Sequence, residues 1–135
     1  MKRNYVGKFC SLVFFAVLTV GIFCFSSCVK KTVDPVAITA SKTVAENTTL
    51  LQLMEDMESE NELSFSIKNG MVEEINGVKN TTNSFWMLYT SDEASANTAW
   101  GTYEYNGETL GRAVVGATDL IVGANEVYVW VYQTF

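Results

Sequence analysis

The sequence predicts an α+β domain in which an antiparallel or mixed β-sheet packs on one amphipathic helix, preceded by a signal peptide. Three observations carry this prediction: an uncharged leader, one segment with helical periodicity, and several later segments rich in alternating or β-branched residues. The length of 135 residues fits one domain. We place a lipoprotein signal peptide at 1–27, a tether at 28–35 and the folded domain at 36–135.

The leader has the pattern of an export signal. Lys2, Arg3 and Lys8 make its start positive, and Phe9–Phe25 then runs for seventeen residues without a charge. A permanent membrane span is the weaker interpretation, because spanning takes about 20 apolar residues. We therefore expect export and cleavage.

The leader ends in a sequence that looks like the lipobox of bacterial lipoproteins. Small Ser26 and Ser27 precede Cys28, which would be acylated and become the first residue of the mature chain. Two acyl chains anchor a protein stably where one is marginal. We predict that Cys28 is lipidated and holds the protein in membrane lipid on the extracytoplasmic face of the bacterial cell membrane. An ordinary export signal with an incidental cysteine stays the alternative.

The composition excludes several classes of function. The chain has no His, and its three Cys all lie at or before Cys28, so the folded part has no thiolate metal ligand and no Ser/His or Cys/His pair. Cleavage before Cys28 leaves six basic against fifteen acidic residues, a net charge of −9. Such a chain is unsuited to bind nucleic acid. We expect a binding protein rather than an enzyme, with no required cofactor.

The first elements of the domain are a strand and a helix. Val36–Ala40 carries β-branched residues and predicts the strand. Asn47–Thr49 offers N-cap side chains, and the apolar residues that follow recur at three- and four-residue spacing. We expect this stripe to be core and the acidic residues of the other face to be solvated. The stripe consists of Leu50, Leu53, Met54 and Met57.

Asn-Gly turn signals separate the strands that come next. Leu63–Ile67 alternates strictly between apolar and polar residues, and Asn69-Gly70 joins it to a partner strand at Met71–Ile75. A second turn at Asn76-Gly77 and a polar loop lead to Phe85–Tyr89, which predicts a central strand.

The last third of the sequence carries fewer signals of secondary structure. Residues 91–101 predict a loop, and Tyr103–Tyr105 predicts a short strand closed by Asn106-Gly107. Residues 108–125 receive no assignment, because three glycines interrupt any single helix. Val127–Tyr132 predicts a final strand with valines on one face and aromatic rings on the other.

Four motifs, which follow one another in the same order as in the family, resemble the transcobalamin-like C-terminal domain family. This family is common in bacterial surface proteins and lipoproteins. Thr49–Met54 resembles the family's opening helix motif, and Ile75–Val78 gives its Ile-Asn-Gly-Val turn. Phe85–Tyr89 matches its aromatic-Trp strand, and Val129–Phe135 matches its closing strand. The resemblance covers Thr49–Phe135.

The resemblance implies a β-grasp-like fold and a corrinoid (cobalamin) as ligand. In the eukaryotic cobalamin carriers this domain clamps the corrinoid against a helical partner domain, for which this chain has no room. The family's ligand contacts lie near the aromatic-Trp strand and a later loop. Together with the flat, apolar rings of the second half of the chain, this predicts ligand contacts at Phe85, Trp86, Tyr89, Trp100 and Tyr103.

Trp100 is the most diagnostic of these residues, because the sequence places it in a loop without a core role. A sheet core built from the same aromatics stays the alternative. Three functions remain open: a lipid-anchored binding protein that feeds a small ligand to a transporter, a surface adhesion or protein-interaction module, and a hydrolase whose carboxylates meet from distant segments.

Overall fold

The computed structural model describes residues 32–135. The predicted signal peptide, the predicted lipidation site Cys28 and the first residues of the tether lie outside the described residues. Lys31–Phe135 forms one compact unit, and both of its core clusters consist of its own residues. It therefore has what a domain needs to fold without the leader.

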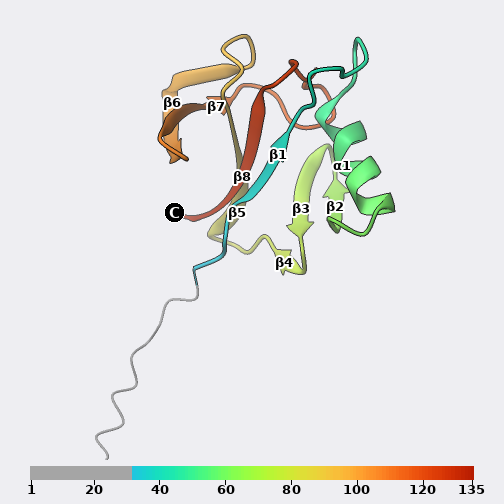
Figure 1. The fold of residues 1–135 in the computed structure, drawn as a ribbon. Coiled ribbons are helices and arrows are strands. Elements are labelled where there is room, and N and C mark those ends of the chain that lie inside the picture. Colours follow the sequence, from blue (N-terminus) through green and yellow to red (C-terminus); the bar gives the residue numbers. More distant parts are fainter. Residues whose placement is uncertain (1–31) are drawn as a thin grey trace, which may run out of the picture. The chain divides into compact units, whose positions relative to one another are not determined.

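Five strands form the larger sheet (Figure 1). Their order across the sheet is β1 (Val36–Thr39), β8 (Val127–Thr134), β5 (Ser84–Thr90), β7 (Glu108–Ala113) and β6 (Ala96–Tyr105). Each of the pairings between these strands is antiparallel. The predicted central strand is thus confirmed, since β5 lies third of five.

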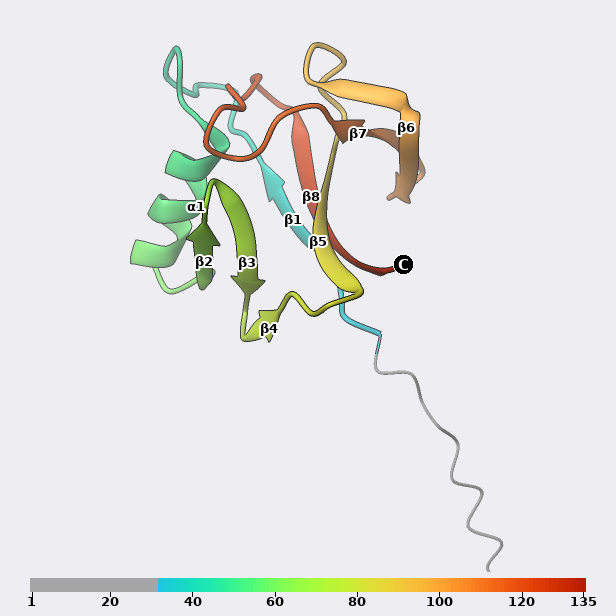
Figure 2. The same ribbon diagram turned by 180° about the vertical axis from the view of Figure 1, so that it is seen from behind.

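A second, smaller sheet and the helix lie together on one side of the larger sheet, and the β6–β7 hairpin extends from the other side (Figure 2). The small sheet has the order β2 (Phe65–Lys68), β3 (Met71–Ile75) and β4 (Val78–Lys79), and the helix α1 spans Leu50–Ser59. The sequence predicted one sheet. The structure has two: β4 pairs with Glu74 and Ile75 of β3, and no strand of the larger sheet pairs with β3.

The helix begins and packs as its sequence predicts. Thr49 is the N-cap, and it forms a capping box in which its side chain accepts from the Gln52 backbone N–H and the Gln52 side chain accepts from the Thr49 backbone N–H. Leu50 and Met54 are fully buried, while Leu53 and Met57 pack partly buried against the same core.

The three Asn-Gly pairs are hairpin turns, as predicted. In each pair both residues have positive φ, with 52° and 77° at Asn69 and Gly70 as the example. Such angles are those of the two-residue turn whose twist matches that of antiparallel strands. The other pairs are Asn76-Gly77 and Asn106-Gly107.

The prediction of a loop over residues 91–101 is wrong in its second half. β6 begins at Ala96, and it pairs with β7 across the Asn106-Gly107 turn. The pairing is interrupted between Asn97 and Thr102, where four residues of β6 have no register partner. This bulge and the small, polar composition of an edge strand hide the strand from periodicity.

The core forms on both faces of the larger sheet. The larger cluster fills the space between this sheet, the small sheet and the helix, and includes Leu50, Trp86 and Tyr128. The smaller cluster lies on the other face and includes Tyr89, Leu110 and Val129. Alternation along β5 and β8 supplies side chains to both clusters, as the sequence predicts for β8.

Candidate ligand groove

One edge of β5 is open over more than half of the strand. β8 pairs with all of β5 from Ser84 to Thr90, whereas β7 pairs on the other edge only with Tyr89 and Thr90. Beyond Ala113 the chain leaves β7 and runs toward the helix. Phe85–Leu88 therefore has a partner strand on one edge only.

A groove of about 580 Å³ lies along this open edge. We call it the β5 groove. Its walls come from five parts of the chain: the start of β3 with the turn before it, Asn80 after β4, the open half of β5, the end of β7 with the chain that follows it, and β8 with the C-terminal residue. The lining residues are Gly70, Met71, Val72, Asn80, Phe85, Trp86, Met87, Leu88, Arg112, Ala113, Val114, Val115, Gly116, Ala117, Trp130 and Phe135.

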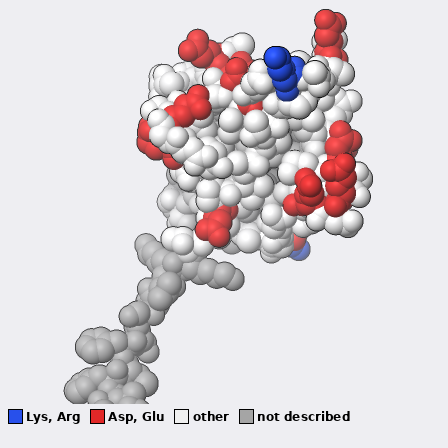
Figure 3. All heavy atoms as spheres, in the orientation of Figure 1, with Lys and Arg blue, Asp and Glu red and all other residues white. Residues whose placement is uncertain are grey.

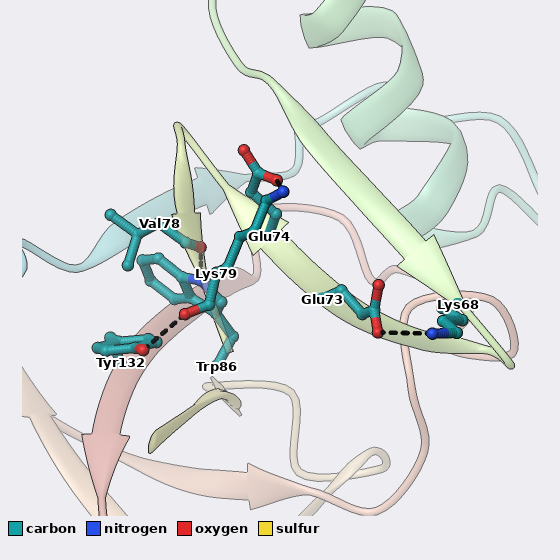
Figure 4. Close-up of polar contacts among 7 residues, drawn as sticks. All are labelled: Lys68, Glu73, Glu74, Val78, Lys79, Trp86 and Tyr132. Atoms are coloured by element: carbon teal, nitrogen blue, oxygen red, sulfur yellow. Dashed lines mark hydrogen bonds and ion pairs between the residues drawn. The ribbon is translucent and has the colours of Figure 1, made fainter. Parts of the chain in front are cut away.

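Trp86 is a fixed wall of the β5 groove. Its side chain is 6% exposed, its indole Nε1 donates to the Val78 carbonyl at 2.8 Å, and its ring packs on Tyr132 with centroids 5.2 Å apart. The Tyr132 hydroxyl in turn donates to the Lys79 carbonyl at 2.6 Å. Figure 4 shows these contacts joining β4 to the larger sheet.

Asn80 closes the end of the groove between the two sheets. Its side-chain Oδ1 accepts from the Trp86 backbone N–H at 2.9 Å, and its Nδ2 donates to the Val72 carbonyl at 2.9 Å. The Asn80 side-chain amide thus hydrogen-bonds one backbone group of β5 and one of β3 that have no partner in a neighbouring strand. This contact fixes the spacing of the two groove walls.

The remaining walls are apolar and partly solvent-exposed. Phe85 and Phe135 have ring centroids 6.4 Å apart and line the groove together with Val114 and Val115. Each of the four is at least 39% exposed. Exposed apolar side chains that line a concavity are typical of a binding surface.

Two polar side chains of the groove stand out. Trp130 is 4% exposed, and its indole Nε1 is buried without a hydrogen-bond partner within residues 32–135. Arg112 has the one charged side chain among the residues that line the groove, and its Nη2 donates to Met87 Sδ at 3.7 Å. No carboxylate lies within 4.0 Å of that guanidinium among the described residues.

The structure divides the predicted ligand contacts between two places. Phe85 and Trp86 line the β5 groove. Tyr89 and Tyr103 do not; they pack together on the face of the sheet opposite to Trp86, with ring centroids 5.6 Å apart. Tyr89 is 4% exposed and its hydroxyl donates to Gln133 Oε1 at 2.9 Å, as a core residue with a satisfied polar tip.

Trp100 does not lie in a loop, and that expectation is wrong. It sits in the four-residue bulge of β6, with 57% of its surface exposed. It is outside the β5 groove. Gly101 in the same bulge has a φ of 137°, and an added Cβ there would lie 3.8 Å from the Tyr89 hydroxyl, an ordinary contact distance.

Sequence reasoning missed the second wall of the groove. This wall includes Arg112, Val114 and Val115, for whose stretch of the chain the sequence predicts no element. It also includes Phe135, which the sequence predicts only as part of a strand. A usable signal exists in the sequence: Arg112 is the single arginine after the leader, and it stands directly before an apolar run.

Residues 32–135 meet the requirements neither of a metal site nor of a membrane-spanning helix. Residues 32–135 contain no group of three acidic, His or Cys side chains that could hold a metal ion. Within the same residues no helix is long and apolar enough to cross a membrane.

Comparison of the chain with protein-family models, with curated proteins and with solved structures returns no match. The resemblance to the transcobalamin-like C-terminal domain therefore stays a prediction. The geometry of the β5 groove is the firmer basis for a function.

Proposed function

We propose that this protein is a lipid-anchored extracytoplasmic binding protein that holds a small ligand in the β5 groove. The observation that carries the proposal is a concave, largely apolar site of about 580 Å³ with a few polar groups. Ligand sites in proteins typically measure about 300–1,000 Å³ and have this composition. Binding without chemistry fits a chain that has no His and no Cys beyond its leader.

The leader supports the location. A positive start, an uncharged run and small residues before Cys28 favour export and acylation, and the predicted tether places the domain a few residues from the lipid. A binding protein at this place would pass its ligand to a transporter in the same membrane. We propose this as the partner.

A β-grasp-like arrangement and a corrinoid ligand are the finer proposals. The two antiparallel sheets with one helix are compatible with an α+β fold, the broader class to which a β-grasp belongs. Phe85 and Trp86, which belong to the aromatic-Trp strand of the resemblance, are walls of the groove. A corrinoid would lie over the groove, with only part of its surface enclosed.

Direct binding tests the groove. The unit Lys31–Phe135 is titrated with cyanocobalamin by calorimetry, alongside a variant in which Val115→Tyr places a ring in the groove. A matched control, Ile121→Tyr, changes a similarly exposed aliphatic residue that does not line it. We expect Val115→Tyr alone to abolish binding. If the unaltered unit gives no heat of binding, a corrinoid is excluded as the ligand. If all three proteins bind with equal affinity, the β5 groove is excluded as the binding site.

Cell fractionation tests the anchor. The full-length protein should partition with membranes, and Cys28→Ala should appear in the extracytoplasmic or culture fraction, because the acyl chains are lost. Membrane association of Cys28→Ala equal to that of the unaltered protein contradicts acylation at this residue.

An adhesion or protein-interaction module is the second candidate. It is favoured by Trp100, which is 57% exposed on β6, an edge strand of the larger sheet. Exposed tryptophan on an edge strand suits a protein interface. Loss of partner capture on Trp100→Ala, with the groove variants unaffected, would support this candidate over the first.

A further inference from the structure

Two of the four cations within residues 32–135, Arg112 and Lys42, have no acidic partner, and only Arg112 of these two is half-buried, since Lys42 is exposed. Lys68 and Lys79 each have an acidic partner, with Nζ 3.6 Å from Glu73 and 3.5 Å from Glu74 (Figure 4). Both of these ion pairs lie on the small sheet, where the side chains are largely solvated. Arg112 has no such partner within residues 32–135, although the chain carries fifteen acidic residues.

The surroundings of Arg112 are unusual for an unpaired guanidinium. The residue is half-buried, and the groove that it lines has mainly aliphatic and aromatic walls. A guanidinium has five N–H donors, and the hydrogen bond seen here goes to the weak acceptor Met87 Sδ. The remaining donors are available to an anion in the groove.

The rest of the domain is poor in positive charge. Figure 3 shows acidic side chains outnumbering basic ones on one face of the domain. An anion approaching such a surface is repelled except where a cation is exposed within reach. An Arg in an apolar concavity thus gives both attraction and selectivity, because its planar fork pairs with two oxygens of one carboxylate, sulfonate or phosphate.

We propose that the β5 groove takes an apolar small molecule with one anionic group, and that Arg112 pairs with this group. This inference rests on the proposed ligand function of the groove. Its apolar body would lie against Phe85, Val115 and Phe135, while the anion meets the guanidinium at the end of the groove that Met87 and Arg112 form.

A matched pair of fluorescent probes tests the charge requirement. Anilinonaphthalene sulfonate and phenylnaphthylamine share one aromatic body and differ in the sulfonate. Both are titrated into the unit Lys31–Phe135. We expect the sulfonate probe to bind more tightly than the uncharged probe. Arg112→Gln should lower the affinity for the sulfonate probe about tenfold and leave the affinity for the uncharged probe unchanged.

Two variants control for charge and for folding. Arg112→Lys keeps the charge but not the fork, so it should restore part of the affinity for the sulfonate probe. Lys42→Gln removes a positive charge that does not line the groove, and it should change neither probe. Arg112→Lys also keeps the test valid if Arg112→Gln fails to fold, because its partial affinity for the sulfonate probe still reports on the guanidinium fork.

The outcomes separate this inference from the proposed function. Equal binding of both probes, with no effect of Arg112→Gln or Arg112→Lys, overturns the role of Arg112 and leaves the groove as a site for neutral ligands. If Val115→Tyr leaves the affinity for both probes unchanged, the β5 groove is excluded as their binding site. Self-association of the unit that Phe135→Ala abolishes, seen by sedimentation, would show that a second copy of the chain covers the groove and would also overturn the inference.

Discussion

The two halves of β5 meet different neighbours, and the difference locates the candidate site. At Tyr89 and Thr90 the strand has partners on both edges, β8 and β7, and both side chains are at most 4% exposed. From Phe85 to Leu88 the β7 edge is open, and the groove lies there. A sheet interior that is closed on both edges leaves no room for a ligand, whereas a departing neighbour strand creates a concavity.

Exposed aromatics by themselves are therefore a poor guide in this molecule. Trp100 belongs to the closed half, since its bulge lies over Tyr89, and it is exposed on a strand rather than in a hollow. Trp86 is almost completely buried and yet forms a groove wall. What distinguishes a ligand wall here is the concavity beside it.

The largest expected effect contrasts these two tryptophans. Trp86→Ala should lower the free energy of unfolding by about 3–5 kcal/mol, because it removes a large buried ring and leaves a cavity. Trp100→Ala should change it by less than about 0.5 kcal/mol, as for an exposed side chain. Urea unfolding of both variants measures the difference. Comparable losses in the two variants would show that the bulge of β6 is part of the core.

The bulge of the closed half depends on Gly101. Its φ of 137° is a conformation that side chains with a Cβ adopt only under strain. Gly101→Ala should therefore cost about 1–3 kcal/mol of unfolding free energy. Thermal unfolding followed by circular dichroism measures it. A neutral outcome would mean that the bulge relaxes freely.

Within the open half, two groove tryptophans differ in one hydrogen bond. The Trp86 indole donates to Val78, whereas the Trp130 indole has no partner within the described residues. Trp86→Phe should thus destabilise more than Trp130→Phe, by about 1 kcal/mol, because it alone removes a hydrogen bond and leaves the partly buried Val78 carbonyl unpaired. Denaturant midpoints of the two variants provide the comparison, and a larger loss for Trp130→Phe would contradict it.

The smallest effect concerns Tyr128, which pairs with Thr90 in the closed half. Burial raises the pKa of Tyr128 above 10.0, although the Gly123 backbone N–H donates to its hydroxyl at 2.8 Å. The neutral phenol therefore stabilises the fold below about pH 10, and this contribution is lost as the pH rises through the raised pKa. The stability gap between the unaltered protein and Tyr128→Phe should shrink from about pH 8 to about pH 11. A constant gap would contradict burial of this hydroxyl.

Local sequence signals predicted the elements, and long-range pairing decided the rest. The cap at Thr49, the stripe beginning at Leu50 and the Asn-Gly turns act over a few residues, so the sequence alone reveals them. The start of β6 at Ala96 and the separation into two sheets depend on which strands pair with one another. Periodicity carries no information on that choice.

The candidate site was only half predictable for the same reason. Phe85 and Trp86 belong to a strand with a clear aromatic pattern. Arg112 and Val115 reach the groove because β7 leaves β5 after two paired residues, which is a property of the sheet and not of the local sequence. An arginine beside an apolar run is a weak signal until the structure places it in a concavity.

The indole N–H signals in a nitrogen–proton correlation spectrum test the central claim most directly. The chain has three tryptophans, one exposed on the hairpin and two that line the β5 groove, so three signals report on both regions at once. On titration of the unit Lys31–Phe135 with anilinonaphthalene sulfonate, we predict shifts of the Trp86 and Trp130 signals and an unchanged Trp100 signal. A shift of the Trp100 signal alone would contradict the account and place the binding surface on the β6–β7 hairpin.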